Sequence, residues 1–343
     1  MQIYRWMNKK RKKIFWVVAV LLVILTGCAI FAYTLMTAKA PNSGDERGCL
    51  IYVDRDDTVD SVRMKSELGW RWDIYNKVLS YKPRTGRYRV EPEMTCLQLY
   101  RVLRNGTQEP MNLVIPTSRT MDRLASALSK SLMADSAEIA SVLTDSSYCC
   151  KLGYTTATIP ALFIPNTYEV YWDVPVDKLI ERMVQENSRF WTDERKSKAE
   201  ACGLTHEEVA TLASIVDEET ANDAEKPMIA GLYLNRLRIG MKLQADPTVK
   251  FAVGDFSLRR ILGKHLRTES PYNTYLHEGL PPGPIRIASI AGLDAVLNHA
   301  EHHYLYMCAK EDFSGTHNFA ATFPEHYQNA RRYIRALNER GIK

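Results

Sequence analysis

A run of 23 residues without a charged side chain, residues 14–36, directly follows a basic cluster at the N-terminus. At about 1.5 Å per residue, a helix of that length crosses the hydrocarbon core of a bilayer. Residues 1–13 carry six Lys and Arg residues and no acidic one, and positive charge before a span favours a cytoplasmic N-terminus. The sequence therefore predicts a cytoplasmic segment 1–13, a single-pass transmembrane helix 14–36, a linker 37–47 and an extracytoplasmic or periplasmic remainder.

A competing motif lies inside the apolar run. Residues 25–28 read Leu-Thr-Gly-Cys and resemble the lipobox of bacterial lipoproteins, in which Cys28 would become the lipidated N-terminus. A lipobox should be followed by polar sequence, whereas residues 29–36 continue the apolar run. An uncleaved anchor is the favoured interpretation, and both alternatives tether the chain to a membrane.

The charge balance changes once the basic cluster is set aside. The chain has a net charge of +5, so without the six positive charges of that cluster the remainder carries a net charge of −1. A nucleic-acid partner thereby loses its main electrostatic support. With 343 residues, 45% of them hydrophobic, the chain can bury one large core or two modest ones.

Six of the seven cysteines lie outside the apolar run. An exported location permits disulfides, but the cysteine spacing shows no framework, and the adjacent Cys149 and Cys150 are poorly placed to bridge each other. No disulfide is predicted.

A helix with an acidic residue on its apolar face is readable from residue 205 to residue 219. Thr205 and Glu208 have the spacing of a capping box, and the residues after them form a stripe at helical spacing: Val209, Leu212, Ile215 and Val216. Glu219 lies seven residues after Leu212, about 700° around the helix, and so falls on the same stripe. The two acids before it are turned toward the solvated side, where they are predicted to be ordinary surface charge: Asp217 and Glu218.

A carboxyl group held against apolar neighbours has a raised pKa, which suits a general acid working near neutral pH. Glu219 is therefore a candidate catalytic acid. The alternative is an acid at a helix end whose stem packs while its head reaches water, and spacing alone leaves both open.

A second helix is predicted from about Pro227 to Gly240, followed by a polar loop over residues 241–248. Together with this loop, segments over nearly the whole chain after the apolar run resemble the YceG-like, or MltG, family of membrane-anchored endolytic murein transglycosylases. The resemblance rests on several long segments: residues 214–220 (SIVDEET), residues 231–249 (GLYLNRLRIGMKLQADPTV), Tyr272-Asn273-Thr274-Tyr275, residues 279–285 (GLPPGPI), Tyr304-Leu305-Tyr306, and His317 with Phe319.

The resemblance implies a set of site residues. The family's catalytic acid directly precedes a Thr or Ser, which places it at Glu219 before Thr220. Further matched positions are expected to bind substrate or to orient the acid: Gln244, Asp246, Thr248, Tyr272, Asn273 and Thr274. Asn235 and Arg236 are interpreted as structural residues that tie the second helix to the loop. The sequence departs from the family's pattern at Asp217, Glu218 and Asn166.

The region after the linker contains a weak internal repeat of strand and capped helix. Three short strands are predicted, each followed by a threonine that could cap a helix: Ile51–Val53 with Thr58, Tyr88–Val90 with Thr95, and Val114–Ile115 with Thr120. Such units are similar to the LysM-like part of the family, which implies a LysM-like α/β subdomain at 48–116 and a mixed α+β catalytic domain at 117–343. The subdomain could bind glycan, with Trp70 and Trp72 as candidates, or serve only as a scaffold.

Two other segments are given a structure but no chemistry. Residues 163–171 are expected to form a loop that lines the cleft, and residues 176–199 a single amphipathic helix. The histidines His299, His302 and His303 come with no recognisable ligand spacing, and no metal or cofactor is predicted.

The resemblance implies cleavage of the MurNAc–GlcNAc bond of nascent peptidoglycan strands without water, leaving 1,6-anhydroMurNAc ends, with Glu219 as acid and then as base. Penicillin-binding proteins and glycan polymerases at the inner membrane are the partners it suggests. Two alternatives stay open: a muramidase, which would hydrolyse the bond with Asp246 as its second carboxylate, and a non-catalytic, membrane-tethered scaffold that binds peptidoglycan.

Overall fold

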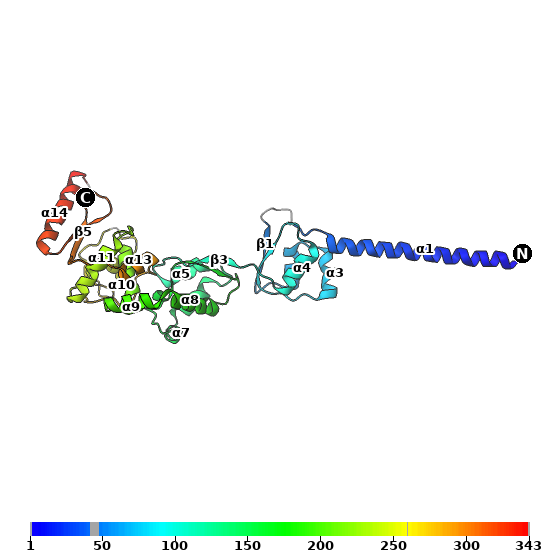
Figure 1. The fold of residues 1–343 in the computed structure, drawn as a ribbon, viewed down its shortest axis with the longest axis horizontal. Helices are drawn as coiled ribbons and strands as arrows, with labels where there is room; N and C mark the ends of the chain where they lie inside the picture. The colour runs from blue at the N-terminus through cyan, green and yellow to red at the C-terminus, as the bar shows by residue number, and fades with distance from the viewer. Residues whose placement is uncertain (1, 42–47, 259, 342–343) are drawn as a thin grey trace. The chain divides into compact units, whose positions relative to one another are not determined.

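The computed structural model describes residues 2–41, 48–258 and 260–341. The chain forms two compact units, Met1–Met111 with Tyr171–Asp173, and Asn112–Val170 with Val174–Lys343 (Figure 1). The predicted mixture of helix and sheet is confirmed. Of the predicted linker 37–47, residues 42–47 lie outside the described residues. The domain boundary at residue 116 stays a prediction.

The first unit begins with the long helix α1, Gln2–Thr37. Within it, Lys10–Thr37 is long and apolar enough to cross a membrane, with a mean hydropathy of 2.9 over its most apolar stretch and no part of that stretch buried in the protein. By length and composition the helix is consistent with the predicted single-pass anchor.

The globular part of the first unit packs helices against a small sheet. Its elements are β1 Cys49–Val53, α2 Val59–Ser66, α3 Trp70–Leu79, β2 Gly86–Val90 and α4 Cys96–Asn105. Strands β1 and β2 are antiparallel, with Ile51 opposite Tyr88. Fully buried aromatic side chains, Trp72, Tyr88 and Tyr100, fill the core between sheet and helices. Residues 171–173 join this unit, since Trp172 packs on Tyr52 with ring centroids 5.1 Å apart.

The predicted threonine caps are confirmed. Thr58, Thr95 and Thr120 each accept a hydrogen bond from the backbone N–H three residues on, at the start of α2, α4 and α5, Met121–Leu128. The three strands of the repeat do not form one sheet, however. The third, β3 at Met111–Val114, pairs with β4 at Thr167–Val170.

The second unit has two hydrophobic cores. One lies under the helices that follow β3 and β4: α5, α6 Ser136–Thr144, α7 Ser146–Lys151, the 3-10 turn η1 Ile159–Leu162, and α8 Val176–Phe190. The other lies around α10: α9 Asp193–Cys202, α10 His206–Glu219, α11 Lys226–Arg238, α12 Asp246–Val253, the 3-10 turn η2 His265–Arg267, and α13 Ile290–Leu297.

Two predictions for this unit are wrong. The single helix expected at 176–199 is broken after Phe190, because the chain turns at Trp191 and Thr192 caps a new helix, α9. The loop expected at 163–171 is partly the strand β4, whose Tyr168 is buried in the core, and no described residue of that segment lines the cavity around Glu219.

The C-terminal part is an antiparallel pair, β5 Tyr306–Ala309 and β6 His317–Ala320, followed by α14 Phe323–Glu339. Thr322 and Glu325 form a capping box at the start of α14, which packs against both strands.

Candidate active site

Helix α10 passes through the middle of its core. The predicted capping box of Thr205 and Glu208 is present, and every residue from Val209 to Val216 is buried. The helix is covered by α9, α11, α12, α13 and η1. Because it has no solvated face along this stretch, each side chain at its C-terminal end needs a partner.

The acids Asp217 and Glu218 are therefore not surface charges, contrary to the prediction. The carboxylate of Asp217 forms an ion pair with Lys226, with 2.7 Å between Oδ1 and Nζ. Both oxygens of Glu218 accept hydrogen bonds from Arg119, at 2.8 and 2.7 Å, and Arg286 adds a third at 2.9 Å. Burial works to raise the pKa of Glu218, but the two arginines outweigh it and lower that pKa below its ordinary value.

Glu219 follows as the last residue of the helix and takes a different environment. Its carboxyl group accepts a hydrogen bond from the hydroxyl of Tyr233 at 2.7 Å. Burial raises the pKa of Glu219 to about 7, against the opposing effect of that hydrogen bond and with a further increase from the negative charge of Asp246. The carboxyl group is thus poised to gain or lose a proton near neutral pH.

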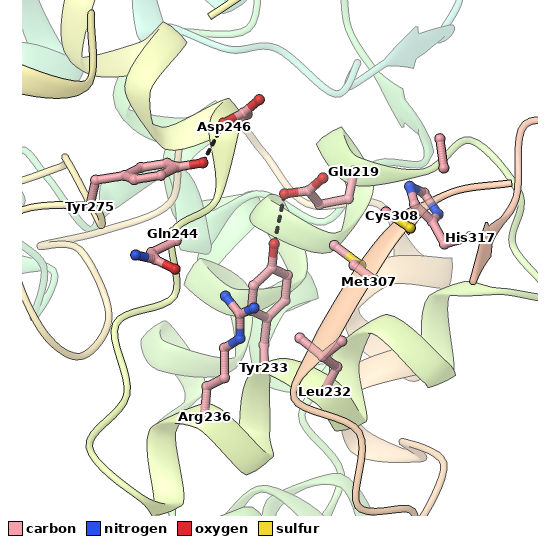
Figure 2. A pocket seen from close by; sticks show the side chains of 11 residues that line it. Glu219, Leu232, Tyr233, Arg236, Gln244, Asp246, Tyr275, Met307, Cys308 and His317 are labelled. Carbon is pink, nitrogen blue, oxygen red and sulfur yellow. Dashed lines mark hydrogen bonds between the residues drawn. The ribbon is translucent and has the colours of Figure 1, made fainter. Parts of the chain in front are cut away.

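Glu219 faces a cavity of about 220 Å³ (Figure 2). The cavity is lined by the end of α10, one face of α11, the loop before α12, and the β5–β6 pair. The lining residues are Glu219, Leu232, Tyr233, Arg236, Gln244, Asp246, Tyr275, Met307, Cys308, Ala309 and His317. Most of them carry polar side chains, which suits a hydroxyl-rich ligand.

Asp246 is held on the opposite wall by the hydroxyl of Tyr275, which donates to its Oδ1 at 2.7 Å (Figure 2). The sequence predicted a polar loop through residue 248, but the loop ends at Ala245 and Asp246 opens α12, with Pro247 in the first turn. Proline fits a helical first turn because its missing N–H is not needed there. The helix therefore fixes the direction of the Asp246 side chain.

Arg236 ties α11 to the loop, as predicted. Its guanidinium donates to the carbonyl oxygens of Leu243 at 2.5 Å and Leu305 at 2.6 Å. Burial lowers the pKa of Arg236 from its ordinary value. Asn235 donates instead to the carbonyl oxygens of His302 and Tyr304, and so holds the segment before β5 rather than the loop.

Thr248 and Thr274 lie behind the cavity wall. Their hydroxyl groups are 2.8 Å apart and both are buried. The carbonyl oxygen of Thr274 accepts a hydrogen bond from the backbone N–H of Gln244, and its hydroxyl oxygen accepts one from the backbone N–H of Ala245. Gln244 has a φ of 49°, uncommon for a residue other than glycine, so these bonds hold it in a conformation that presents it to the cavity.

Asn273 and Tyr272 also support the wall from outside the cavity. The amide of Asn273 donates to the carbonyl oxygens of Leu266 and Thr268, and the ring of Tyr272 packs on Phe251 with centroids 4.6 Å apart. Of the residues expected at the cleft, the structure brings Glu219, Gln244 and Asp246 together at the cavity, and places the other four in contacts around it.

Tyr233, Tyr275 and His317 were matched in the sequence but given no role. His317 is fixed by Glu225, which accepts from its backbone N–H at 2.6 Å and contacts its Nδ1 at 3.0 Å. Tyr233 stands between Leu232 and Leu234, and a hydroxyl-bearing side chain within such an apolar run was the available signal for a buried hydrogen-bond donor.

The histidines considered for metal binding have other contacts. His302 Nε2 contacts the carbonyl oxygen of Met228 at 2.9 Å, and His299 Nδ1 that of Val296 at 3.2 Å. Within residues 2–41, 48–258 and 260–341, no group of three or more His, Cys, Asp or Glu side chains is placed to hold a metal ion.

Comparisons with known proteins agree with this architecture. A sequence model described as the YceG-like family matches residues 58–332. The endolytic murein transglycosylase of Bacillus subtilis strain 168 is 34% identical over 168 residues, 49% of this chain and 46% of that protein. The protein of the same name from Streptococcus pneumoniae R6 is 26% identical over 304 residues, 78% of this chain and 54% of that protein. The chain thus spans about half the length of the curated relatives it matches.

A solved structure shares the fold. The crystal structure of a YceG-like protein from Listeria monocytogenes superposes with a TM-score of 0.54 and 23% sequence identity, over 83% of this chain and 99% of that one.

Proposed function

The chain belongs to the YceG-like family, and from this premise we propose that it is an endolytic lytic transglycosylase that cuts the MurNAc–GlcNAc bond of peptidoglycan strands. The observation that supports the proposal most directly is Glu219, a carboxyl group with a pKa of about 7 that faces a polar cavity and is held by Tyr233. Two relatives of this chain carry the name endolytic murein transglycosylase.

In the proposed reaction, protonated Glu219 gives its proton to the glycosidic oxygen as the bond to the anomeric carbon of MurNAc breaks. The transition state is oxocarbenium-like. The C6 hydroxyl of the same sugar then attacks the anomeric carbon, and the Glu219 carboxylate takes the hydroxyl proton. The acid is regenerated, no water is consumed, and the products are a free GlcNAc hydroxyl and a 1,6-anhydroMurNAc end.

The other cavity residues are proposed to hold the sugar rather than to move protons. Gln244 can both donate and accept, which suits an N-acetyl group, while Asp246 and His317 suit ring hydroxyls. Thr248 and Thr274 act as positioning residues, because their hydrogen bonds fix the loop that carries Gln244. Asn273 has a supporting role, since its amide holds the preceding segment through the carbonyl oxygens of Leu266 and Thr268.

The full-length chain in detergent micelles, incubated with purified glycan strands, provides the test. Mass spectrometry of the released fragments is expected to find MurNAc ends one water lighter than hydrolytic ends. Ordinary reducing ends would instead establish hydrolysis, and fragments released equally by a Glu219→Gln control would exclude Glu219 as the acid.

Hydrolysis is the second candidate, because Asp246 shares the cavity with Glu219 and could activate water. The Asp246→Asn variant separates the two reactions. A muramidase would lose most of its activity with this change, whereas a transglycosylase would keep forming anhydro ends with weakened glycan binding. The scaffold alternative predicts no cleavage in any variant.

Tyr233 offers a test of the acid role that does not depend on abolishing activity. Its hydroxyl donates to the charged form of Glu219, and a hydrogen bond to a charged group contributes about 1.5–3 kcal/mol, which corresponds to about one to two pH units. Tyr233→Phe should therefore raise the pKa of Glu219 and move the basic limb of the kcat/KM profile to higher pH by about that amount.

Tyr275→Phe is the matched control for this prediction, since it removes the same hydroxyl in the same cavity from Asp246 instead of Glu219. A basic limb that stays in place in Tyr233→Phe, or moves equally in both variants, would count against Glu219 as the titrating acid.

The setting of the reaction is likewise proposed. Helix α1 anchors the chain in the inner membrane with the basic segment 1–13 in the cytoplasm, because positive residues favour that side. The sheet and helices at residues 48–116 act as a LysM-like glycan-binding module. Nascent strands near the membrane are the substrate, and penicillin-binding proteins and glycan polymerases the partners.

A further inference from the structure

The end of the apolar helix is packed into the first unit. The ring of Phe31 in α1 stacks on that of Trp70 at the start of α3, with centroids 5.9 Å apart and planes at 18°. One turn further along, the hydroxyl of Tyr75 donates to the carbonyl oxygen of Leu35 at 2.6 Å. Helix α3 therefore lies against the last turns of α1, as Figure 1 shows.

The chain that leaves α1 is also held by the unit. The backbone N–H of Ala40 donates to the carbonyl oxygen of Met94 at 2.8 Å, and the backbone N–H of Cys96 donates to the carbonyl oxygen of Ala38 at 2.8 Å. Lys39 forms an isolated bridge with Thr95 between these bonds. The end of α1 is thus held by a stacked pair of rings and by backbone hydrogen bonds. The sheet and helices of this unit cannot move away from α1 without breaking them.

Counting along the helix places these contacts relative to a bilayer. The charged cluster ends at Lys13, and about 20 helical residues cross a hydrocarbon core of about 30 Å. A span that begins at Ile14 thus ends near Tyr33. Phe31 falls inside that limit, so Trp70, which stacks on Phe31, lies at the level where hydrocarbon gives way to lipid headgroups.

Trp70 itself faces outward. It is 48% exposed, whereas Trp72, two residues later, is 1% exposed and belongs to the core. The guanidinium of Arg71 lies over the Trp70 ring at 4.7 Å from its centroid. In the part of the chain that the structure describes, the Nε of Arg71 has no hydrogen-bond acceptor.

We propose that Trp70 and Arg71 form a membrane-docking patch that rests in the headgroup layer of the leaflet from which α1 emerges. Tryptophan is favoured at this interface because its ring is apolar and its N–H is polar, and an arginine beside it can reach lipid phosphates. The patch holds the first unit flush against the bilayer. The inference rests on the proposed membrane span of α1.

Quenching of tryptophan fluorescence by brominated lipids tests the patch in the full-length chain. The protein is placed in nanodiscs whose phosphatidylcholine and phosphatidylglycerol carry bromine on the acyl chain close to the headgroup. Three variants are compared with the parent chain: Trp70→Phe, Trp16→Phe in the span, and Trp172→Phe. The ring of Trp172 packs on Tyr52 of β1, and Figure 1 shows β1 at the end of this unit away from α1. Phenylalanine keeps the stack on Phe31, so folding is preserved.

Trp70→Phe and Trp16→Phe are each expected to remove a share of the quenchable emission, and Trp172→Phe none. If only Trp16→Phe removes such a share, α1 crosses the bilayer but Trp70 stays in water, and the docking patch is overturned. If no variant changes the quenching, the proposed membrane span of α1 is itself contradicted, and the docking patch with it. If Trp172→Phe reduces it as much as Trp70→Phe, the contact is not specific to this patch and the proposal is overturned as well.

Discussion

Replacing Glu219 with glutamine is expected to slow glycan cleavage by about 10²–10⁴-fold, the range that a positioned general acid contributes. Glutamine keeps the size of the side chain and its oxygen can still accept the Tyr233 hydrogen bond, but it has no proton to give to the glycosidic oxygen. The rate of release of anhydro fragments from purified strands measures the loss. Binding of the same strands should change little.

The same substitution should make the folded chain more stable above neutral pH. The pKa of Glu219 rises from its ordinary value of 4.5 to about 7 on folding, so the folded state holds this proton more tightly than the unfolded state. Stability from this group is complete below pH 4.5 and is lost as pH rises to about 7. The loss amounts to about 3 kcal/mol, at about 1.4 kcal/mol per unit of pKa shift.

The Glu219→Gln variant has no carboxyl group at this position, so it does not lose this stability as the pH rises. Denaturant unfolding at pH 4.5 and at pH 8 should give a variant close to the parent chain at the lower pH and about 3 kcal/mol more stable at the higher one. A variant that is active, or one whose stability differs from the parent chain by the same amount at both pH values, would mean that Glu219 is not the neutral, buried acid inferred here.

Features set by residues close in sequence were predictable. The helix starts at Thr58, Thr95 and Thr120 depend on a side chain and an N–H three residues apart, and all three caps are present. Strand pairing depends on contacts between residues far apart in sequence. The repeat therefore did not predict that β3 pairs with β4 and not with β1 or β2.

The site divides in the same way. The burial of Glu219 was predictable because the apolar stripe on which it lies is a local pattern. Asp217 and Glu218 were assigned to a solvated face that α10 does not have, and the groups that cover it come from Arg119, 99 residues earlier, and Ser289, 72 residues later. Thr248 and Thr274 could be expected near the cleft by resemblance, but only their mutual hydrogen bond identifies them as supports for the loop.

Asp217 now stands out as a buried charge with a structural role. Its side chain is 3% exposed and that of its partner Lys226 is 7% exposed. It also accepts hydrogen bonds from the backbone N–H of Ser289 at 2.6 Å and from the Ser289 hydroxyl at 2.7 Å. Ser289 caps α13, so one carboxylate connects the C-terminal end of α10, the first turn of α11 and the start of α13.

Asp217→Ala is expected to lower the free energy of unfolding of the second unit by about 3–5 kcal/mol, because it leaves the ammonium group of Lys226 buried without its main partner. Asp223→Ala is the matched control. It removes a carboxylate from the same lysine at the same 2.7 Å, but Asp223 is 70% exposed, and an exposed pair contributes about 0–1 kcal/mol. Urea unfolding of both variants, with hydrogen exchange of α10 and α13 to locate the change, measures the difference. Equal losses in the two variants would show that burial of the Asp217 pair does not govern its contribution.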